Sequence, residues 1–128
     1  MAAQGLTLDA GALIAVEKQD RPLMAVLKAA VEREVTITVP AVVLAQAWRG
    51  NSPTIARLLT TCEVEDLNEI GAKRIGVLLS KGRRSDVVDA AVVVGARLRG
   101  DAIVTSDPDD IDHLVAAAGG ARLEIISV

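Results

Sequence analysis

The sequence predicts an α/β fold with a mainly parallel central sheet and helices on both faces. Strand-like and helix-like segments alternate along the chain, and the apolar residues are almost all aliphatic. Proline and glycine fall singly at places where elements should begin or end. Strands that alternate with helices need crossover connections, and these favour parallel pairing. No linker-like or repeated segment interrupts the pattern, so we expect one domain over residues 1–128.

Five segments are expected to form strands because they are short, apolar and rich in β-branched residues. They are residues 6–8, 35–39, 62–65, 102–106 and 123–128. Seven segments have helical patterns, at 12–17, 22–34, 42–49, 53–60, 69–80, 87–99 and 108–118. Asp20, Ser52 and Asp107 each stand just before or near a proline and are expected to cap the helix that follows. Gly100 and Gly119 are expected to end helices with a positive φ.

The composition narrows the class of protein. A chain of 128 residues that is 51% hydrophobic can bury a core, although Trp48 is its only aromatic residue. A net charge of −3 and the lack of aromatic stacking platforms argue against a protein that coats nucleic acid through bulk charge. The single cysteine, Cys62, cannot form an internal disulfide, and the longest apolar stretch is too short to span a bilayer. A cytoplasmic protein without a membrane span is the expectation.

Two aspartates directly follow predicted strands. Asp9 comes after residues 6–8, and Asp107 comes after residues 102–106. If those strands are parallel neighbours, both carboxylates lie at the edge where α/β sheets bind ligands. Each could instead only cap the helix that follows it. The two together favour a shared site.

A second pair of acids opens the helix expected at 87–99. Asp86 and Asp89 are three residues apart and therefore lie on one face of its first turn. Asp86 is either the helix cap or a ligand. Asp89 is followed by an apolar run, where a carboxylate without a partner cation is costly. Converging aspartates suit Mg²⁺ or Mn²⁺, whereas one histidine and one cysteine are too few for a zinc site.

Basic residues next to these acids are candidate substrate contacts. Arg83 and Arg84 come just before Asp86, where they would either receive phosphates or form a solvated loop. Arg49 could reach substrate or a partner subunit. His113 is expected at the surface without a catalytic role. The chain contains no phosphate-binding glycine loop and no serine–histidine–aspartate set, which argues against nucleotide-binding and serine-hydrolase functions.

Four segments resemble the PIN domain, and specifically the VapC family of ribonuclease toxins. They read LDAGALIA at 8–15, VPAVVLAQAWRG at 39–50, SDVVDAAVVVGARLRG at 85–100 and AIVTSDPDDI at 102–111. The last two are the most specific. The family has an aspartate that opens an alanine-rich helix, a glycine that ends it, and a strand that leads to a Thr-x-Asp. Asp89, Gly100, Thr105 and Asp107 fit that order, and Asp9 matches the first family aspartate.

The resemblance implies an Mg²⁺- or Mn²⁺-dependent endoribonuclease that forms a homodimer and is inhibited by a VapB-type antitoxin. It implies that Asp9, Asp89 and Asp107 bind the metal, completed by Asp86 or Gln46, and that Thr105 supports them. Two features depart from the family pattern. Gln46 stands where the family usually has a glutamate, and Ala10 and Gly11 stand where a hydroxyl residue usually follows the first aspartate. Asp86, Asp109 or Asp110 could restore the missing charge. The alternative function is a catalytically impaired PIN module that binds protein or RNA without cleaving it.

Overall fold

The computed structural model describes residues 4–128, in which five parallel strands form one sheet in the order β3-β2-β1-β4-β5. The strands are β1 (Gly5–Leu8), β2 (Thr36–Pro40), β3 (Glu63–Glu65), β4 (Ala102–Thr105) and β5 (Ile125–Ser127). The helices are α1 (Ala10–Glu17), α2 (Arg21–Glu32), α3 (Ala41–Ala47), α4 (Pro53–Leu59), α5 (Glu69–Gly82), α6 (Val87–Arg99) and α7 (Pro108–Ala118). Each expected strand and helix is present, and the predicted fold class is confirmed.

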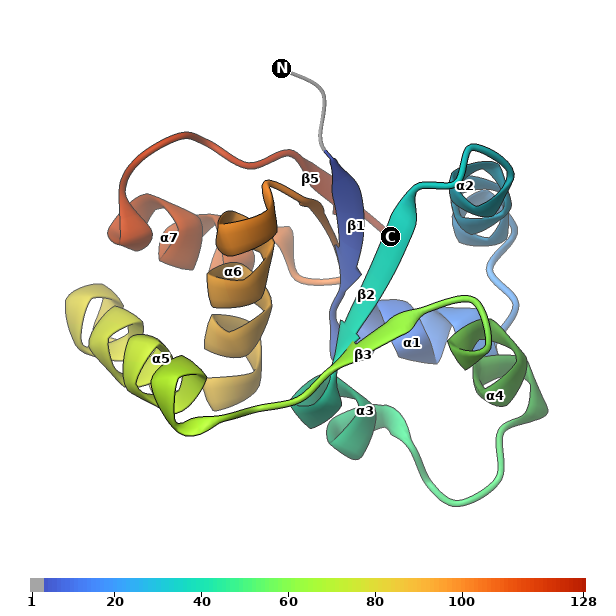
Figure 1. Cartoon of the computed structure of the whole chain (residues 1–128), viewed down its shortest axis with the longest axis horizontal. Helices are drawn as coiled ribbons and strands as arrows, with labels where there is room; N and C mark the ends of the chain where they lie inside the picture. The colour runs from blue at the N-terminus through green and yellow to red at the C-terminus, as the bar shows by residue number, and fades with distance from the viewer. Residues whose placement is uncertain (1–3) are drawn as a thin grey trace.

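Helices cover both faces of the sheet. Helices α5, α6 and α7 pack together on one face, and α1, α2 and α4 lie on the other (Figure 1). Helix α3 follows β2 directly and packs against both α1 and α6 at the carboxyl edge of the sheet. No helix within residues 4–128 combines the length and the apolar character needed to cross a bilayer.

The core is built from aliphatic side chains. Strands β1 and β4 are buried along their whole length, as expected for the middle of a sheet that is covered on both sides. Helix α6 turns a stripe of small residues toward them, and its buried positions include Ala90, Ala91, Gly95 and Ala96. Small side chains let this helix approach the sheet closely, which places its first turn near the ends of β1 and β4.

Local signals set most of the helix boundaries. The Asp20 carboxylate accepts a hydrogen bond from the backbone N–H of Leu23, and the Ser52 hydroxyl accepts one from Ile55. Both predicted caps are therefore confirmed. Gly100 ends α6 with a φ of 74°, in the left-handed region where glycine is favoured. Helix α1 begins at Ala10, earlier than expected, because the Asp9 side chain accepts a hydrogen bond from the backbone N–H of Ala12.

Candidate active site

The site lies at the carboxyl edge of the two central strands. Strands β1 and β4 are parallel neighbours, with Leu8 paired to Val104. Asp9, which follows β1, is therefore brought to the same edge of the sheet as Thr105, the last residue of β4, and as Asp107 just after it. The predicted parallel pairing of these two strands is confirmed.

Asp9 is the buried acid of this edge. Its residue is 5% exposed, and one carboxylate oxygen, Oδ1, accepts a hydrogen bond of 2.8 Å from the backbone N–H of Ala12. Burial raises the pKa of Asp9 above its usual value, and hydrogen bonds from the Thr105 side chain and from the backbones of Ala12 and Ser106 act in the opposite direction. Asp9 is thus both the cap of α1 and a carboxylate held in a fixed place by the loop after β4.

Asp89 is surrounded by four other acids whose negative charges act on it. It is half-buried in the first turn of α6, and its pKa is raised to about 6. Burial is the largest cause, followed by the negative charges of Asp86, Asp9, Asp110 and Asp107. Four carboxylates from three different parts of the chain therefore lie close enough to Asp89 to disfavour its ionisation. We call these five residues the acidic cluster.

Asp107 differs from the predicted helix cap. It occupies the N-cap position of α7, but its side chain makes no capping hydrogen bond. Its backbone N–H instead donates a hydrogen bond of 2.8 Å to the Thr105 hydroxyl. The prediction that Asp107 caps α7 is wrong, because the carboxylate turns toward Asp110, whose pKa is raised first by a hydrogen bond with Asp107 and then by its charge. This orientation leaves the Asp107 side chain free of the helix end.

Two further acids complete the cluster. Asp86 is the N-cap of α6, and its Oδ1 accepts a hydrogen bond of 2.9 Å from the backbone N–H of Asp89. The capping interpretation of Asp86 is therefore correct, while its second oxygen remains available. Asp110, one of the acids that could restore the missing charge, belongs to the cluster through its contact with Asp107. Its spacing of three residues from Asp107, one helical turn, was the signal for this contact.

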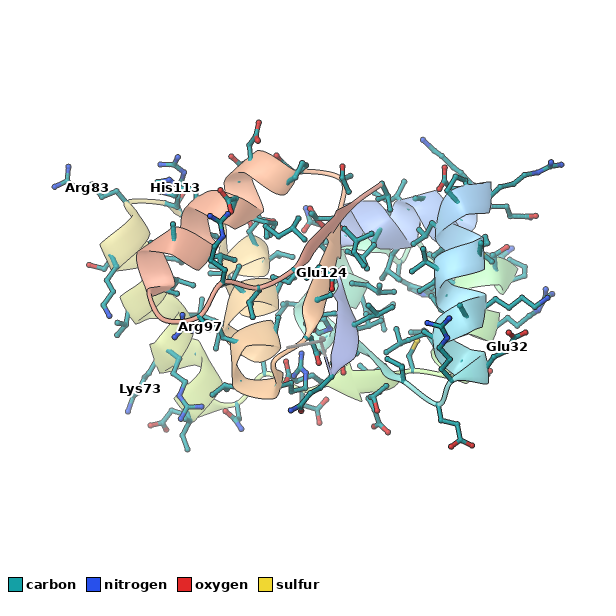
Figure 2. All side chains as sticks on the ribbon, turned by 90° about the horizontal axis from the view of Figure 1, so that it is seen from above. Glu32, Lys73, Arg83, Arg97, His113 and Glu124 are labelled. Atoms are coloured by element: carbon teal, nitrogen blue, oxygen red, sulfur yellow. The ribbon has the colours of Figure 1, made fainter. Side chains whose placement is uncertain are left out.

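The candidate phosphate-binding arginines differ in their positions. Arg84 lies close enough to Asp110 for its charge to oppose the rise in that residue's pKa. Arg83 ends α5 in a left-handed conformation, with a φ of 54°, and points outward at the end of the molecule where His113 also lies (Figure 2). Arg49 lies in the loop after α3, where it is exposed and its Nη1 donates to the carbonyl of the preceding residue, Trp48.

His113 has a role that the sequence did not reveal. It is exposed, as expected, but its Nε2 is 2.7 Å from the carbonyl oxygen of Gly82. This hydrogen bond joins α7 to the last residue of α5, just before Arg83 and Arg84. It helps to hold the segment that carries Arg84 beside the acidic cluster.

Gln46 is exposed on α3. That helix packs against α1 and α6, which both begin at acids of the cluster. The hydrogen bonds found in residues 4–128 do not join Gln46 to any of those acids. Thr105, in contrast, contacts both sides of the site, since its side chain bonds to Asp9 and its hydroxyl accepts from the backbone of Asp107.

The donor atoms of the cluster suit a hard divalent cation. All are carboxylate oxygens, and the salt bridges found among residues 4–128 involve other acids: Glu65, Glu69, Asp101 and Asp112. The negative charge at this edge is therefore not neutralised by a nearby lysine or arginine in contact. In the described chain no three histidine, cysteine or acidic side chains stand close enough to form a ready-made metal cage. Rotation of the other carboxylates toward Asp9 would be needed to form one, since Asp9 is held by hydrogen bonds from Thr105, Ala12 and Ser106. Asp86 uses only Oδ1 in its capping bond.

The fold of this chain matches solved structures over nearly its whole length. One is a chain of VapBC2 from Rickettsia felis, crystallised with a DNA fragment from the VapBC2 promoter. The match has a TM-score of 0.64 and 15% sequence identity, and it covers 96% of this chain and 98% of that chain. Another is PAE2754 from Pyrobaculum aerophilum, with a TM-score of 0.61 and 18% identity, over 94% of this chain and 90% of that chain.

This is a PIN-like fold. The resemblance expected from the four sequence segments is thereby confirmed at the level of the fold. No family model and no curated protein matches the sequence. At identities of 15% and 18%, the likeness concerns the arrangement of strands and helices, and the chemistry of the site depends on the residues of this chain.

Proposed function

We propose that this protein is an Mg²⁺- or Mn²⁺-dependent endoribonuclease of the VapC type, with its active site at the acidic cluster. The observation that carries the proposal is the convergence of five aspartates from three parts of the chain at the carboxyl edge of β1 and β4. Burial and the charges of the other four acids raise the pKa of Asp89 to about 6, which is consistent with this crowding. Carboxylates concentrated in one place repel one another and destabilise the folded protein unless a positive charge offsets them. A divalent cation is the ligand that this arrangement favours.

Asp9, Asp89 and Asp107 are proposed to hold the cation, with Asp86 or Gln46 completing the site. A divalent cation there would make water more acidic and would offset the charge that gathers on a phosphate in the transition state. Asp9 is suited to this because the α1 cap and the Thr105 side chain fix its orientation. Arg84 is placed to attract a phosphate of the RNA next to the one being cleaved, since its positive charge already acts on Asp110 in the acidic cluster. Arg83 and Arg49 are weaker candidates because neither is directed at the acids.

A VapB-type antitoxin and a second copy of the chain are the proposed partners. One similar structure is itself a VapBC2 complex, which supports an antitoxin for this chain as well. A short open reading frame immediately upstream would be the candidate for it. Co-expression of the two products, followed by size measurement with light scattering, would show whether the pair forms a complex and whether the chain alone is a dimer.

The test of the proposed function is RNA cleavage as a function of divalent cation. The wild type is incubated with a labelled single-stranded RNA in EDTA, in Mg²⁺ and in Mn²⁺, and Asp9→Asn is tested beside it. Asparagine is also a good helix cap, so Asp9→Asn should keep α1 and the fold while removing a charge from the site. Cleavage that needs the cation and is lost in Asp9→Asn supports the proposal. Cleavage that persists in EDTA would contradict it.

A further inference from the structure

Gly11 leaves a space in the site that another residue fills. A side chain at position 11 would begin at a Cβ lying 2.6 Å from the Ser106 Cβ, and that Cβ would overlap the Ser106 hydroxyl oxygen directly. The hydroxyl of Ser106 thus occupies the volume that the side chain of residue 11 would otherwise take. Gly11 lies in the first turn of α1, and Ser106 lies in the loop between β4 and α7.

The same space adjoins Asp9. The Cβ position at residue 11 is 3.5 Å from Asp9 Oδ1, and the Ser106 backbone donates a hydrogen bond to the Asp9 carboxylate. Ser106 therefore approaches the buried acid with its main chain while its side chain extends over the start of α1. The loop after β4 is held against α1 by these contacts.

The Ser106 hydroxyl is available for a ligand. Ser106 is exposed to solvent, and its hydroxyl takes part in none of the side-chain hydrogen bonds found in residues 4–128. A hydroxyl can donate one hydrogen bond and accept two. Beside an acid that already receives several hydrogen bonds, the free donor can serve an oxygen that arrives from outside.

We propose that the Ser106 hydroxyl donates a hydrogen bond to a phosphate oxygen of the RNA strand bound beside Asp9, from the space that Gly11 leaves open. This inference rests on the proposed function, because the substrate of the site is taken to be RNA. It assigns this contact to the loop after β4, from the volume that a side chain at position 11 would otherwise occupy. Hydroxyl groups are common donors to phosphate oxygens in nucleic-acid complexes.

Four variants test this assignment. Ser106→Ala removes the hydroxyl. Gly11→Ser combined with Ser106→Gly moves it to α1, and the glycine at 106 removes the atoms that would clash. Gly11→Ala combined with Ser106→Gly is the matched control, since it differs from the previous variant by one hydroxyl oxygen. Gly11→Ser alone should lower the thermal stability because of the overlap with Ser106.

The readouts are binding and the separation of KM from kcat. Binding of a fluorescein-labelled single-stranded RNA of mixed sequence is measured by anisotropy in an Asp89→Asn background, and steady-state cleavage is measured without that substitution. We expect Ser106→Ala and the Gly11→Ala/Ser106→Gly control to bind RNA about ten-fold more weakly, the effect of one hydrogen bond to a charged group, with KM raised by a similar factor. We expect Gly11→Ser/Ser106→Gly to recover most of that loss. Thermal unfolding confirms that each variant is folded.

The outcomes separate this inference from the proposed function. A wild type that neither cleaves nor binds RNA would contradict the proposed function and with it the contact. A wild type that binds and cleaves RNA while Ser106→Ala binds equally well would contradict only the role of Ser106. The same holds if the two double variants, both folded, bind RNA with equal affinity.

Discussion

Burial and the negative charges of its neighbours both raise the pKa of Asp89, and this makes the free energy of unfolding depend on pH. Its pKa is about 6 in the folded protein, against an ordinary value of 3.8. The folded state therefore holds the Asp89 proton more tightly than the unfolded state does. This contribution makes the protein less stable as the pH rises from about 4 to about 6, and the full cost is present above that range.

Asp89→Asn should remove this cost. In EDTA at pH 7 we expect the variant to be more stable than the wild type by about 1 to 2 kcal/mol, because the cluster loses a charge that burial and repulsion disfavour and solvent screens part of the effect. The gain should vanish near pH 4. Urea unfolding at several pH values measures both. A variant that is less stable than the wild type at pH 7 would show that Asp89 makes a favourable contact in the folded state.

Substitutions of Gln46 test whether this residue belongs to the proposed metal site. If it lies in the shell of the cation, Gln46→Glu should lower the Mg²⁺ concentration needed for half-maximal cleavage about ten-fold, since an added carboxylate strengthens binding of a hard cation. Gln46→Ala is the matched control and should raise that concentration. Identical titration curves for the three proteins would place residue 46 outside the site. A wild type without cleavage at any metal concentration would favour the catalytically impaired binding module.

The site was predictable from sequence only where the position of a residue follows from its own element. Asp9 and Asp107 could be placed at one edge because each follows an apolar strand. The turn of Asp107 away from the helix end toward Asp110 could not be predicted, since a capping and a non-capping aspartate have the same sequence context. The overlap of Ser106 with the space beside Gly11 could not be predicted either, because it depends on a helix turn and a loop that are distant in the chain.

At the scale of elements, the end of α6 is joined to the sheet by a polar network. Asp101 is 4% exposed and accepts hydrogen bonds from the Thr7 hydroxyl, at 2.8 Å, and from Arg99 Nε, at 2.9 Å. Arg99 also donates to Thr7 and pairs with Glu65. The sequence indicated the helix end here through Gly100, but it gave no sign of the network, because Thr7 and Glu65 are far in the chain from Arg99 and Asp101.

Asp101→Ala should destabilise the protein by about 2 to 3 kcal/mol. The substitution leaves the Thr7 hydroxyl without its acceptor and Arg99 Nε without its partner, which is costly in a buried site, although Arg99 still contacts Thr7 and Glu65. Asp112→Ala is the control, because its salt bridge with Arg122 is exposed and should contribute less than about 1 kcal/mol. Urea unfolding measures both. Equal effects of the two substitutions would contradict a structural role for the network.

At the scale of the whole molecule, the alternation of strands and helices predicted the class of fold but not the order of the strands. The order β3-β2-β1-β4-β5 depends on the pairing of β1 with β4, whose residues are separated by most of the chain. That pairing is also what assembles the site. Fold and candidate site are therefore consequences of the same long-range contact.

The most direct test of the central claim is a comparison of metal-dependent RNA cleavage by the wild type, Asp107→Asn and Asp109→Asn. Both substitutions remove one exposed carboxylate from the start of α7, Asp107 at its N-cap and Asp109 in its first turn, but only Asp107 acts on Asp9, Asp89 and Asp110. We predict that the wild type cleaves RNA in Mg²⁺ or Mn²⁺ and that Asp109→Asn cleaves it nearly as fast. In Asp107→Asn the cleavage rate should fall at least about a hundred-fold, as expected when a group that stabilises the transition state is removed. Equal cleavage by all three proteins, or equal loss in both variants, would contradict an active site at the acidic cluster.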